Sequence, residues 1–352
     1  MKWTNLASNK AGVTVVIVGL TVNPIGKKRL FSPVERSSEV RVVDNINAYL
    51  VPAPNAIVES STVVLSPLSR MLRGNLPNDG GHLLLSREEA ACLLRETPES
   101  NKFVKKFIGA REFINSSPRF CLWIKDDMRE HAETISEIKR RIVAVEKTRE
   151  AGGKQARDHK GRPHRFVTVP HTSGLAIFVP AITSENREYL PVGVADDSTV
   201  VGAKCYVMYD QPLWNMAIVA SRLHWVWIGA VCVRMRTDFS YSNTLGWNTF
   251  PAPTLTDKNK ADLTHCAEDI LLAREAHWPA TIADLYDPEN MPADLRAAHD
   301  RNDEVLERIY IGRRFKNDTE RLEKLFELYT KMTAGKGSKA GTKNSKRKAA
   351  TS

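Results

Sequence analysis

Polar side chains alternate with larger ones in the segment 231–242, which reads VCVRMRTDFSYS. In an extended strand every second side chain lies on the same face, so Arg234, Arg236, Asp238 and Ser240 would share one face. Arginine can donate two hydrogen bonds to guanine, and aspartate can accept one from the amino group of cytosine. The pattern therefore fits a face that reads base edges. It also fits a half-buried strand whose polar side carries a local Arg–Asp pair, which is the commoner case on periodicity alone.

An acidic cluster offers a second kind of chemistry. Asp126 and Asp127 precede Glu137 and Lys139, an order similar to the acidic groups and Glu-x-Lys that hold Mg²⁺ in nucleases. Glu137 and Lys139 fall within a helical pattern, which favours an exposed helix face over a metal site. The sequence contains no GxGxxG, GxxxxGK[ST], HExxH or GxSxG motif and no Cys/His cluster suited to zinc. We therefore expect no metal.

The charge balance points to a polyanionic partner. The chain has 51 Lys and Arg against 41 Asp and Glu, a net charge of +10 and a pI near 9.3. Cationic side chains that neutralise phosphates release counterions, which favours binding to nucleic acid. Part of the excess lies in the Lys-, Gly- and Ser-rich stretch after Ala334, which lacks the apolar residues to fold around and is expected to be disordered.

Cysteine usage and hydropathy predict a cytoplasmic protein without a membrane span. The five cysteines are scattered, as expected for reduced and mostly buried thiols. No signal-peptide pattern is found at the start of the sequence. The segment 213–233 approaches the length of a membrane helix, but Arg222 and His224 lie in its middle, so a core element is predicted there.

The elements that must position these residues follow from periodicity. The β-branched run 13–20 predicts a strand buried on both faces, with neighbours supplied from later in the chain or from outside it. Ser86 and Glu89 form a capping box, and an amphipathic helix is predicted over 127–149. The basic loop 154–165 that follows is expected to be a solvated connection, with DNA contact as the alternative.

The rest of the chain divides in two by its periodicity. Short β-type runs over 166–209 predict a mixed sheet. Helical periodicity then dominates 254–278, 295–311 and 319–332, with Asn317 as a helix cap and Gly312 as a helix stop. The C-terminal third is therefore expected to be helical.

Six stretches of the chain resemble one known family. They are WTNLASNKAGVTVVIVGL at 3–20, GNLPNDGGHLLLS at 74–86, FIGAREFI at 107–114, RFCLWI at 119–124, VPAITSENREYLP at 179–191, and 222–253, which contains SYSNTLGWNTFPAP. They are similar to the C-terminal part of the MmeI-like enzymes, the type IIL/IIG restriction–modification proteins and their methyltransferase-only relatives. These are S-adenosylmethionine-dependent DNA adenine methyltransferases of class I.

The resemblance implies a mixed α+β chain with four parts. It implies that residues 1–45 are the last strands of a Rossmann-like methyltransferase sheet and that residues 46–248 are a mixed α/β target-recognition domain. Residues 249–332 would be a helical C-terminal domain, and 333–352 a disordered basic tail.

The sequence departs from the family in the residues of the reaction itself. The glycine motif for the cofactor and the catalytic Asn-Pro-Pro-Tyr/Phe are absent, since Asn23-Pro24 is followed by Ile25-Gly26. Methylation of a flipped adenine needs both, so no catalytic residue is assigned and the chain alone is expected to be inactive, with S-adenosylmethionine bound only in the complete enzyme. In addition, Cys232 and Val233 stand where the family usually has glycine before arginine.

What the resemblance implies for binding is a module that recognises double-stranded DNA. Arg236, Asp238 and Ser240 are expected to read bases, and a second set to contact phosphates: Arg187, Arg234, Lys105 and Lys106. Two alternatives stay open. The chain could pair with a separate polypeptide that carries the catalytic motifs, as a split methyltransferase, or it could be a degenerate remnant with an exposed sheet edge and poor solubility.

Overall fold

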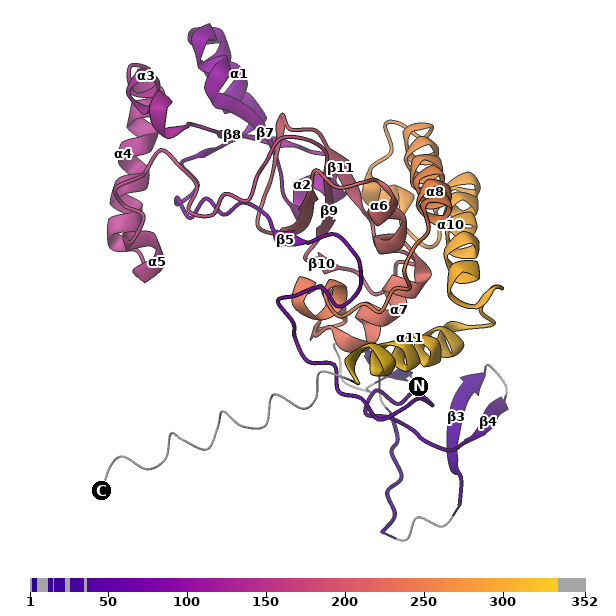
Figure 1. The fold of residues 1–352 in the computed structure, drawn as a ribbon. Helices are drawn as coiled ribbons and strands as arrows, with labels where there is room; N and C mark the ends of the chain where they lie inside the picture. Colours follow the sequence, from indigo (N-terminus) through magenta and orange to yellow (C-terminus); the bar gives the residue numbers. More distant parts are fainter. Residues whose placement is uncertain (1, 5–11, 15, 23–25, 35–36, 335–352) are drawn as a thin grey trace, which may run out of the picture.

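The computed structural model describes residues 2–4, 12–14, 16–22, 26–34 and 37–334. Within them the chain is a mixture of helices and small sheets, as predicted, arranged as a lobe, a central body and a group of C-terminal helices (Figure 1). Within this described part, no helix combines the length and the apolar character needed to cross a bilayer. The basic tail predicted for 333–352 lies outside the described residues beyond Ala334.

The N-terminal region contains two antiparallel hairpins. The first pairs β1 (Lys2–Thr4) with β2 (Gly12–Thr14), and the second pairs β3 (Lys28–Val34) with β4 (Ser37–Val43). Arg41 of β4 forms an ion pair with Glu323, which ties the second hairpin to the C-terminal helices.

The strand predicted over 13–20 differs from the structure. Residues 16–20 form no strand, and Ile17 and Leu20 are about nine-tenths exposed, whereas Val15 lies outside the described residues. A strand buried on both faces needs a neighbouring strand and covering helices. The described residues supply neither to this run, so the prediction of burial is wrong for it.

The lobe is built on a sheet of order β12-β7-β8-β6. Its strands are β6 (Leu84–Leu85), β7 (Val104–Ile108), β8 (Arg119–Leu122) and β12 (Thr199–Val201), with β12 parallel to β7 and the other pairs antiparallel. Around it lie α1 (Arg87–Glu96), η1 (Pro98–Phe103), α2 (Ala110–Ile114), η2 (Asp126–Met128), α3 (Arg129–Glu133), α4 (Ser136–Ala151) and α5 (Lys154–Arg157).

Local signals explain the helices of the lobe. The predicted capping box is confirmed, since the Ser86 hydroxyl accepts from the Glu89 amide and the Glu89 carboxylate accepts from the Ser86 amide. The helix predicted over 127–149 is interrupted at Thr134 and Ile135, so it is two helices rather than one. Ile138, Ile142 and Val145 of α4 are buried in the core of the lobe, as their spacing predicts.

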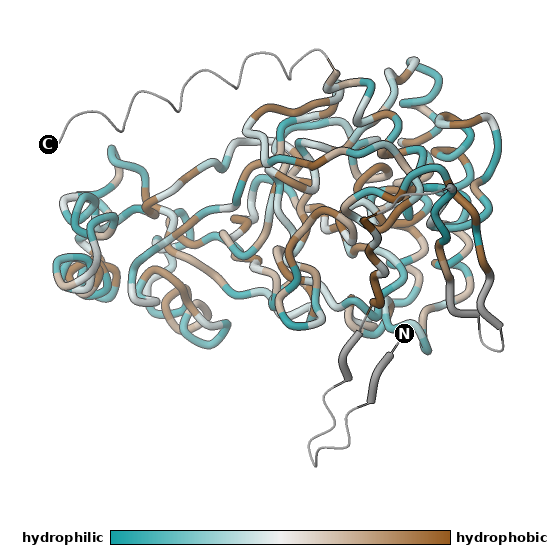
Figure 2. The backbone as a smooth tube through the Cα atoms, turned by 90° about the horizontal axis from the view of Figure 1, so that it is seen from below, coloured by the Kyte–Doolittle hydropathy of each residue, from teal (hydrophilic) through white to brown (hydrophobic). Residues whose placement is uncertain are grey.

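The central body contains a second sheet of order β11-β9-β13-β5 and two buried helices. The strands are β5 (Leu72–Arg73), β9 (Ala176–Pro180), β11 (Gly193–Ala195) and β13 (Cys205–Tyr209), all antiparallel to their neighbours. The helices are α6 (Trp214–Val219) and α7 (Arg222–Val231). The core element predicted over 213–233 is thus confirmed as two helices, and Figure 2 shows apolar residues concentrated in the middle of the molecule.

The C-terminal third is helical, as predicted. It contains α8 (Asp257–Glu275), α9 (Ile282–Leu285), α10 (Ala293–Ile311) and α11 (Asp318–Thr333). The Asn317 side chain accepts from the Glu320 amide at the start of α11, and Gly312 ends α10 in the left-handed conformation, so both predicted helix ends are confirmed. These helices share one hydrophobic core with α6 and α7.

Candidate nucleic-acid interface

A small three-stranded sheet carries most of the predicted site. Its order is β10-β15-β14, with β10 (Ile182–Thr183), β14 (Arg234–Met235) and β15 (Asp238–Ser240) all antiparallel. The sheet is followed by the π-helical turn η3 (Asn243–Trp247). The single extended strand assumed for 231–242 is therefore wrong, because the chain reverses between Met235 and Asp238.

The reversal changes which side chains share a face. Met235 lies opposite Asp238, so only Arg236 and Thr237 form the turn, and Arg236 has a φ of 60°. A left-handed residue in a two-residue turn matches the twist of a hairpin. The period of two that would place Arg234 and Asp238 on one face is broken at this turn.

Arg234 lies on the buried side of the hairpin, opposite Phe239. Its guanidinium carbon is 4.1 Å from the centroid of the Phe239 ring, and Nη1 donates to Glu185 Oε2 at 2.8 Å and to the Thr237 carbonyl at 3.0 Å. A cation over an aromatic face, also paired with a carboxylate, is held in one position. Through these contacts Arg234 stabilises the hairpin.

Asp238 and Ser240 lie on the other side of the hairpin, which faces solvent, and both are half-buried. Arg236 extends from the turn and is exposed. Among the described residues Arg236 has no hydrogen-bond or ion-pair partner. The three residues predicted to read bases thus come from one hairpin, and the cation at its tip has all of its donors available.

Arg187 lies close to the same hairpin. Its Nη1 donates to the hydroxyl of Thr183 on β10 at 3.1 Å. Burial lowers the pKa of the Arg187 guanidinium, and the carboxylate of Asp238 opposes that shift, which places the two charges within electrostatic reach of each other. The structure therefore brings Arg187, Arg234, Arg236, Asp238 and Ser240 together.

The two predicted lysines belong to a different sheet. Lys105 and Lys106 are neighbours on β7 in the lobe, so their side chains point to opposite faces. Lys105 Nζ donates to the backbone carbonyl of Asp197 at 2.8 Å, whereas Lys106 is exposed. The structure does not group them with the hairpin, and one straight DNA segment against one face of this sheet would meet only one of them.

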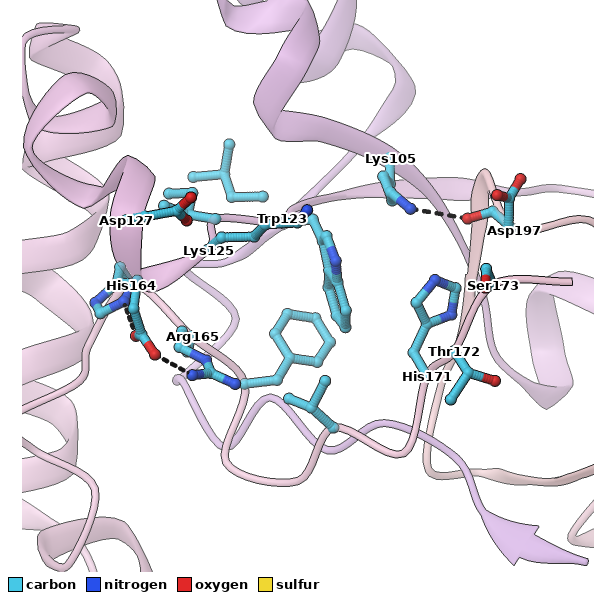
Figure 3. Close-up of a pocket in the computed structure, with 15 residues that line it drawn as sticks. Lys105, Trp123, Lys125, Asp127, His164, Arg165, His171, Thr172, Ser173 and Asp197 are labelled. Atoms are coloured by element: carbon cyan, nitrogen blue, oxygen red, sulfur yellow. Dashed lines mark hydrogen bonds and ion pairs between the residues drawn. The ribbon is translucent and has the colours of Figure 1, made fainter. Parts of the chain in front are cut away.

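A cleft of about 570 Å³ lies beside the sheet of the lobe, lined by residues 122–127 from the end of β8 and by the loop 164–173 that leads to β9 (Figure 3). Three rings form its aromatic wall: the Trp123 centroid is 5.3 Å from that of Phe166 and 5.2 Å from that of His171. The charged side chains that line it are balanced: Lys105, Lys125 and Arg165 against Asp126, Asp127 and Asp197. With no excess of positive charge, the cleft is poorly suited to phosphates.

The acidic cluster considered for metal chemistry is already paired within the protein. Asp126 Oδ1 lies 2.8 Å from His164 Nε2, and its second oxygen pairs with Arg165. The hydrogen bond to His164 lowers the pKa of the Asp126 carboxyl. Glu137 pairs with Arg140 and with Arg141, at 2.7 and 2.8 Å. Glu137 lies on α4, so the prediction of a helix face at this position is confirmed. Among the described residues no group of acidic, histidine or cysteine side chains is arranged to hold a metal.

The aromatic wall of the cleft was missed by sequence reasoning. Trp123 follows β8, whereas Phe166 and His171 belong to the loop before β9, more than 40 residues later. Only the folding of that loop against the sheet of the lobe brings the rings together, and no spacing in the sequence marks it. The available signal was the run of basic and aromatic residues at 162–166.

Comparisons with known proteins agree on one relationship. The family model for the target recognition domain of MmeI matches residues 52–254, and that for the MmeI C-terminal domain matches 255–335. DNA methyltransferase A of Bacillus subtilis (strain 168) is 38% identical over 334 residues, covering 94% of this chain and 37% of that protein. The type IIL restriction–modification enzyme MmeI, solved in complex with DNA, superposes with a TM-score of 0.80 and 27% identity, covering 95% of this chain and 45% of MmeI.

The chain therefore spans less than half the length of these two relatives. The match to the target-recognition model alone covers more than half of the chain, and the C-terminal match continues from it without a gap. This chain belongs to the MmeI family.

Proposed function

We propose that this chain is the part of a site-specific DNA adenine-N6 methyltransferase, in a restriction–modification type system, that recognises the DNA sequence. The match to a target-recognition domain, the relative solved in complex with DNA and the net charge of +10 all support it. Cationic surfaces favour duplex DNA through counterion release, and sequence is then read at base edges.

The observation that carries the proposal is the hairpin tip. Arg236 is exposed with no partner among the described residues, beside Asp238 and Ser240 on the solvent side of β15. A two-stranded ribbon is narrow enough for the major groove, where arginine donates to guanine and aspartate accepts from cytosine. In the proposal these three residues read bases.

The remaining predicted residues would contact the DNA backbone. Arg187 lies beside the hairpin. Arg234, on β14, uses only Nη1 in its bonds to Glu185 and Thr237, which leaves its other donors for a phosphate. Lys106 is exposed on β7, whereas Lys105 would have to release the Asp197 carbonyl to reach a phosphate outside the cleft. Phosphate contacts of this kind set orientation rather than sequence preference.

Methyl transfer itself is assigned to residues outside this sequence. S-adenosylmethionine is held by class I enzymes at a glycine-rich turn between a strand and a helix. The described residues before Leu50 form hairpins and irregular chain with no helix, so they do not fit that cofactor. The proposal is that the chain binds DNA and methylates nothing alone.

Replacing Arg236 tests the base-reading role. The bound sequence is first selected from a library of randomised duplexes, and affinity is then measured for the selected and for unrelated duplexes. Arg236→Ala should weaken binding to the selected duplex by about 1–3 kcal/mol, roughly 5- to 150-fold, and change binding to unrelated duplexes little. Arg140→Ala, at an exposed arginine on α4, is the matched control. An equal loss for all sequences would show that Arg236 does not read bases.

A methylation assay separates the proposal from its alternatives. The purified chain should transfer no tritiated methyl group from S-adenosylmethionine to DNA. Transfer that appears only when a polypeptide carrying Asn-Pro-Pro-Tyr/Phe is added would establish a split methyltransferase. Failure to bind DNA, together with aggregation of the purified chain, would instead favour a degenerate remnant.

A further inference from the structure

Apolar side chains are exposed on the sheet that carries the base-reading residues. Ile182 is 42% exposed, Val233 68% and Met235 54%. Single exposed apolar residues are common on protein surfaces and need no explanation. Here the three residues come from two segments about 50 positions apart and meet on one small sheet.

The register of the sheet places them on one face. Ile182 lies opposite Ser240, and the Ser240 amide donates to the Val233 carbonyl at 2.9 Å, so these three residues form a row across the sheet. Met235 lies opposite Asp238, two residues along β15 and hence on the same side.

The other face of the sheet is packed against the protein. Thr183 lies opposite Phe239, and these two side chains are only 1% and 5% exposed. The sheet therefore has a buried face and a solvent face, and the solvent face mixes three apolar side chains with a carboxylate and a hydroxyl.

This mixture matches the major-groove edge of a base pair that contains thymine. Thymine presents a methyl group beside its O4 acceptor, and its partner adenine presents an amino donor beside N7. A carboxylate and a hydroxyl can bond the polar atoms, and an apolar side chain can cover the methyl group. We infer that Met235, supported by Val233 and Ile182, contacts a thymine methyl group in the recognised sequence. This inference rests on the proposed function.

The charges around the face favour DNA over a protein partner. Arg236 is exposed at the turn next to Met235, and Arg187 lies by Thr183 on β10. A patch of three apolar side chains is small for a stable protein interface, which needs about 800 Å² on each side. In a groove of DNA the same patch needs only to cover single methyl groups.

The test uses thymine's methyl group as the probe. The full chain is used to select a binding sequence from randomised duplexes, and each thymine of the selected duplex is then replaced by uracil, which lacks only the methyl group. Uracil at one or two positions should weaken binding about fourfold each, the loss expected from one uncovered methyl group. If no sequence is enriched, the proposed function fails. If a sequence is enriched but uracil changes nothing at any position, only the present inference fails.

Variants then assign the methyl contact to the sheet. Met235→Ala should bind the thymine and uracil duplexes equally, at the level of wild type on uracil, whereas Met235→Leu should keep most of the preference for thymine. Leu272→Ala, at a 62% exposed leucine of α8, is the matched control and should behave as wild type. A Met235→Ala variant that still distinguishes thymine from uracil by fourfold would overturn the assignment of this residue.

Discussion

Arg149 is the most completely buried cation of the lobe, and no carboxylate in the described part of the chain forms an ion pair with it. Its guanidinium instead donates to five backbone carbonyls: those of Pro77, Asn78, His159, Arg162 and Arg165. Burial lowers the pKa of this guanidinium, and the carboxylate of Asp79 partly opposes the shift. One side chain of α4 thus joins the turn before β6 to the basic loop, which was predicted to be a solvated connection.

We expect Arg149→Met to destabilise the protein by about 3 kcal/mol. Methionine keeps much of the volume but donates no hydrogen bond, so five hydrogen bonds to backbone carbonyls are lost in a buried site. Because three of these carbonyls, those of His159, Arg162 and Arg165, belong to the basic loop, amide hydrogen exchange over 159–165 should accelerate more than over α8. Arg140→Met, which removes a 67% exposed guanidinium of the same helix, provides the comparison and should change the free energy of unfolding little. Equal losses of stability in the two variants would show that the bonds from Arg149 to the five carbonyls do not stabilise the protein.

At the scale of elements, helix ends were the best-predicted features because they depend on single residues. Gly312 has a φ of 76°, and its amide donates to the Arg308 carbonyl at the end of α10. We expect Gly312→Ala to lower the free energy of unfolding by about 1 kcal/mol, since an L side chain disfavours this conformation even though open space surrounds the residue. Gly161→Ala should be neutral or stabilising, because Gly161 has equally open space and its φ lies outside the left-handed region. Urea denaturation of both variants gives the comparison, and a similar loss in both would rule out a conformational cause.

Elements that depend on partners distant in the sequence were predicted less well. The stripe that defines α11 can be read locally, and Leu325, Phe326 and Tyr329 are buried as it predicts. The sequence at 234–240 predicts one strand instead of a hairpin, because Arg236 and Thr237 lack the Asn-Gly or Gly signal of a two-residue turn. Its two faces are set by pairing with β10, some 50 residues earlier. For this reason the sequence predicts correctly that Arg236, Asp238 and Ser240 lie together, but it places Arg234 on their face, whereas Arg234 lies on the opposite face with Phe239.

At the scale of the whole molecule, the target-recognition and C-terminal regions are one structural unit. The main hydrophobic core runs from Val51 through α6 and α7 to Tyr329 of α11, across the boundary between the two family matches at residue 254. Polar contacts cross the same boundary: Arg222 of α7 pairs with Asp318 of α11 at 2.7 Å, and its amide donates to Asp303 Oδ1 of α10 at 2.7 Å. The C-terminal helices therefore pack directly against the target-recognition region and stabilise it.

The Asp303 contact should make the stability of this unit depend on pH. Burial raises the pKa of Asp303 to about 7, and Glu307 on the same helix adds to the shift. Its pKa in the unfolded chain is near 3.9. Between about pH 4 and pH 7, Asp303 is therefore protonated in the folded protein but ionised in the unfolded chain. The contribution of this group to stability is therefore full below about pH 4 and is lost as the pH rises through 7.

Asp303→Asn removes this titration while its carbonyl oxygen can still accept from the Arg222 amide. We expect the variant to gain stability relative to wild type as the pH rises from about 4 to 8, by up to about 4 kcal/mol for three pKa units. Asp257→Asn, at an exposed carboxylate of α8, corrects for the general loss of one negative charge. Chemical denaturation of the three proteins across this range measures the difference. If Asp303→Asn is destabilised by the same amount at pH 5 and pH 8, Asp303 is ionised in the folded protein throughout, and the Arg222 amide together with Arg321 compensates for its burial.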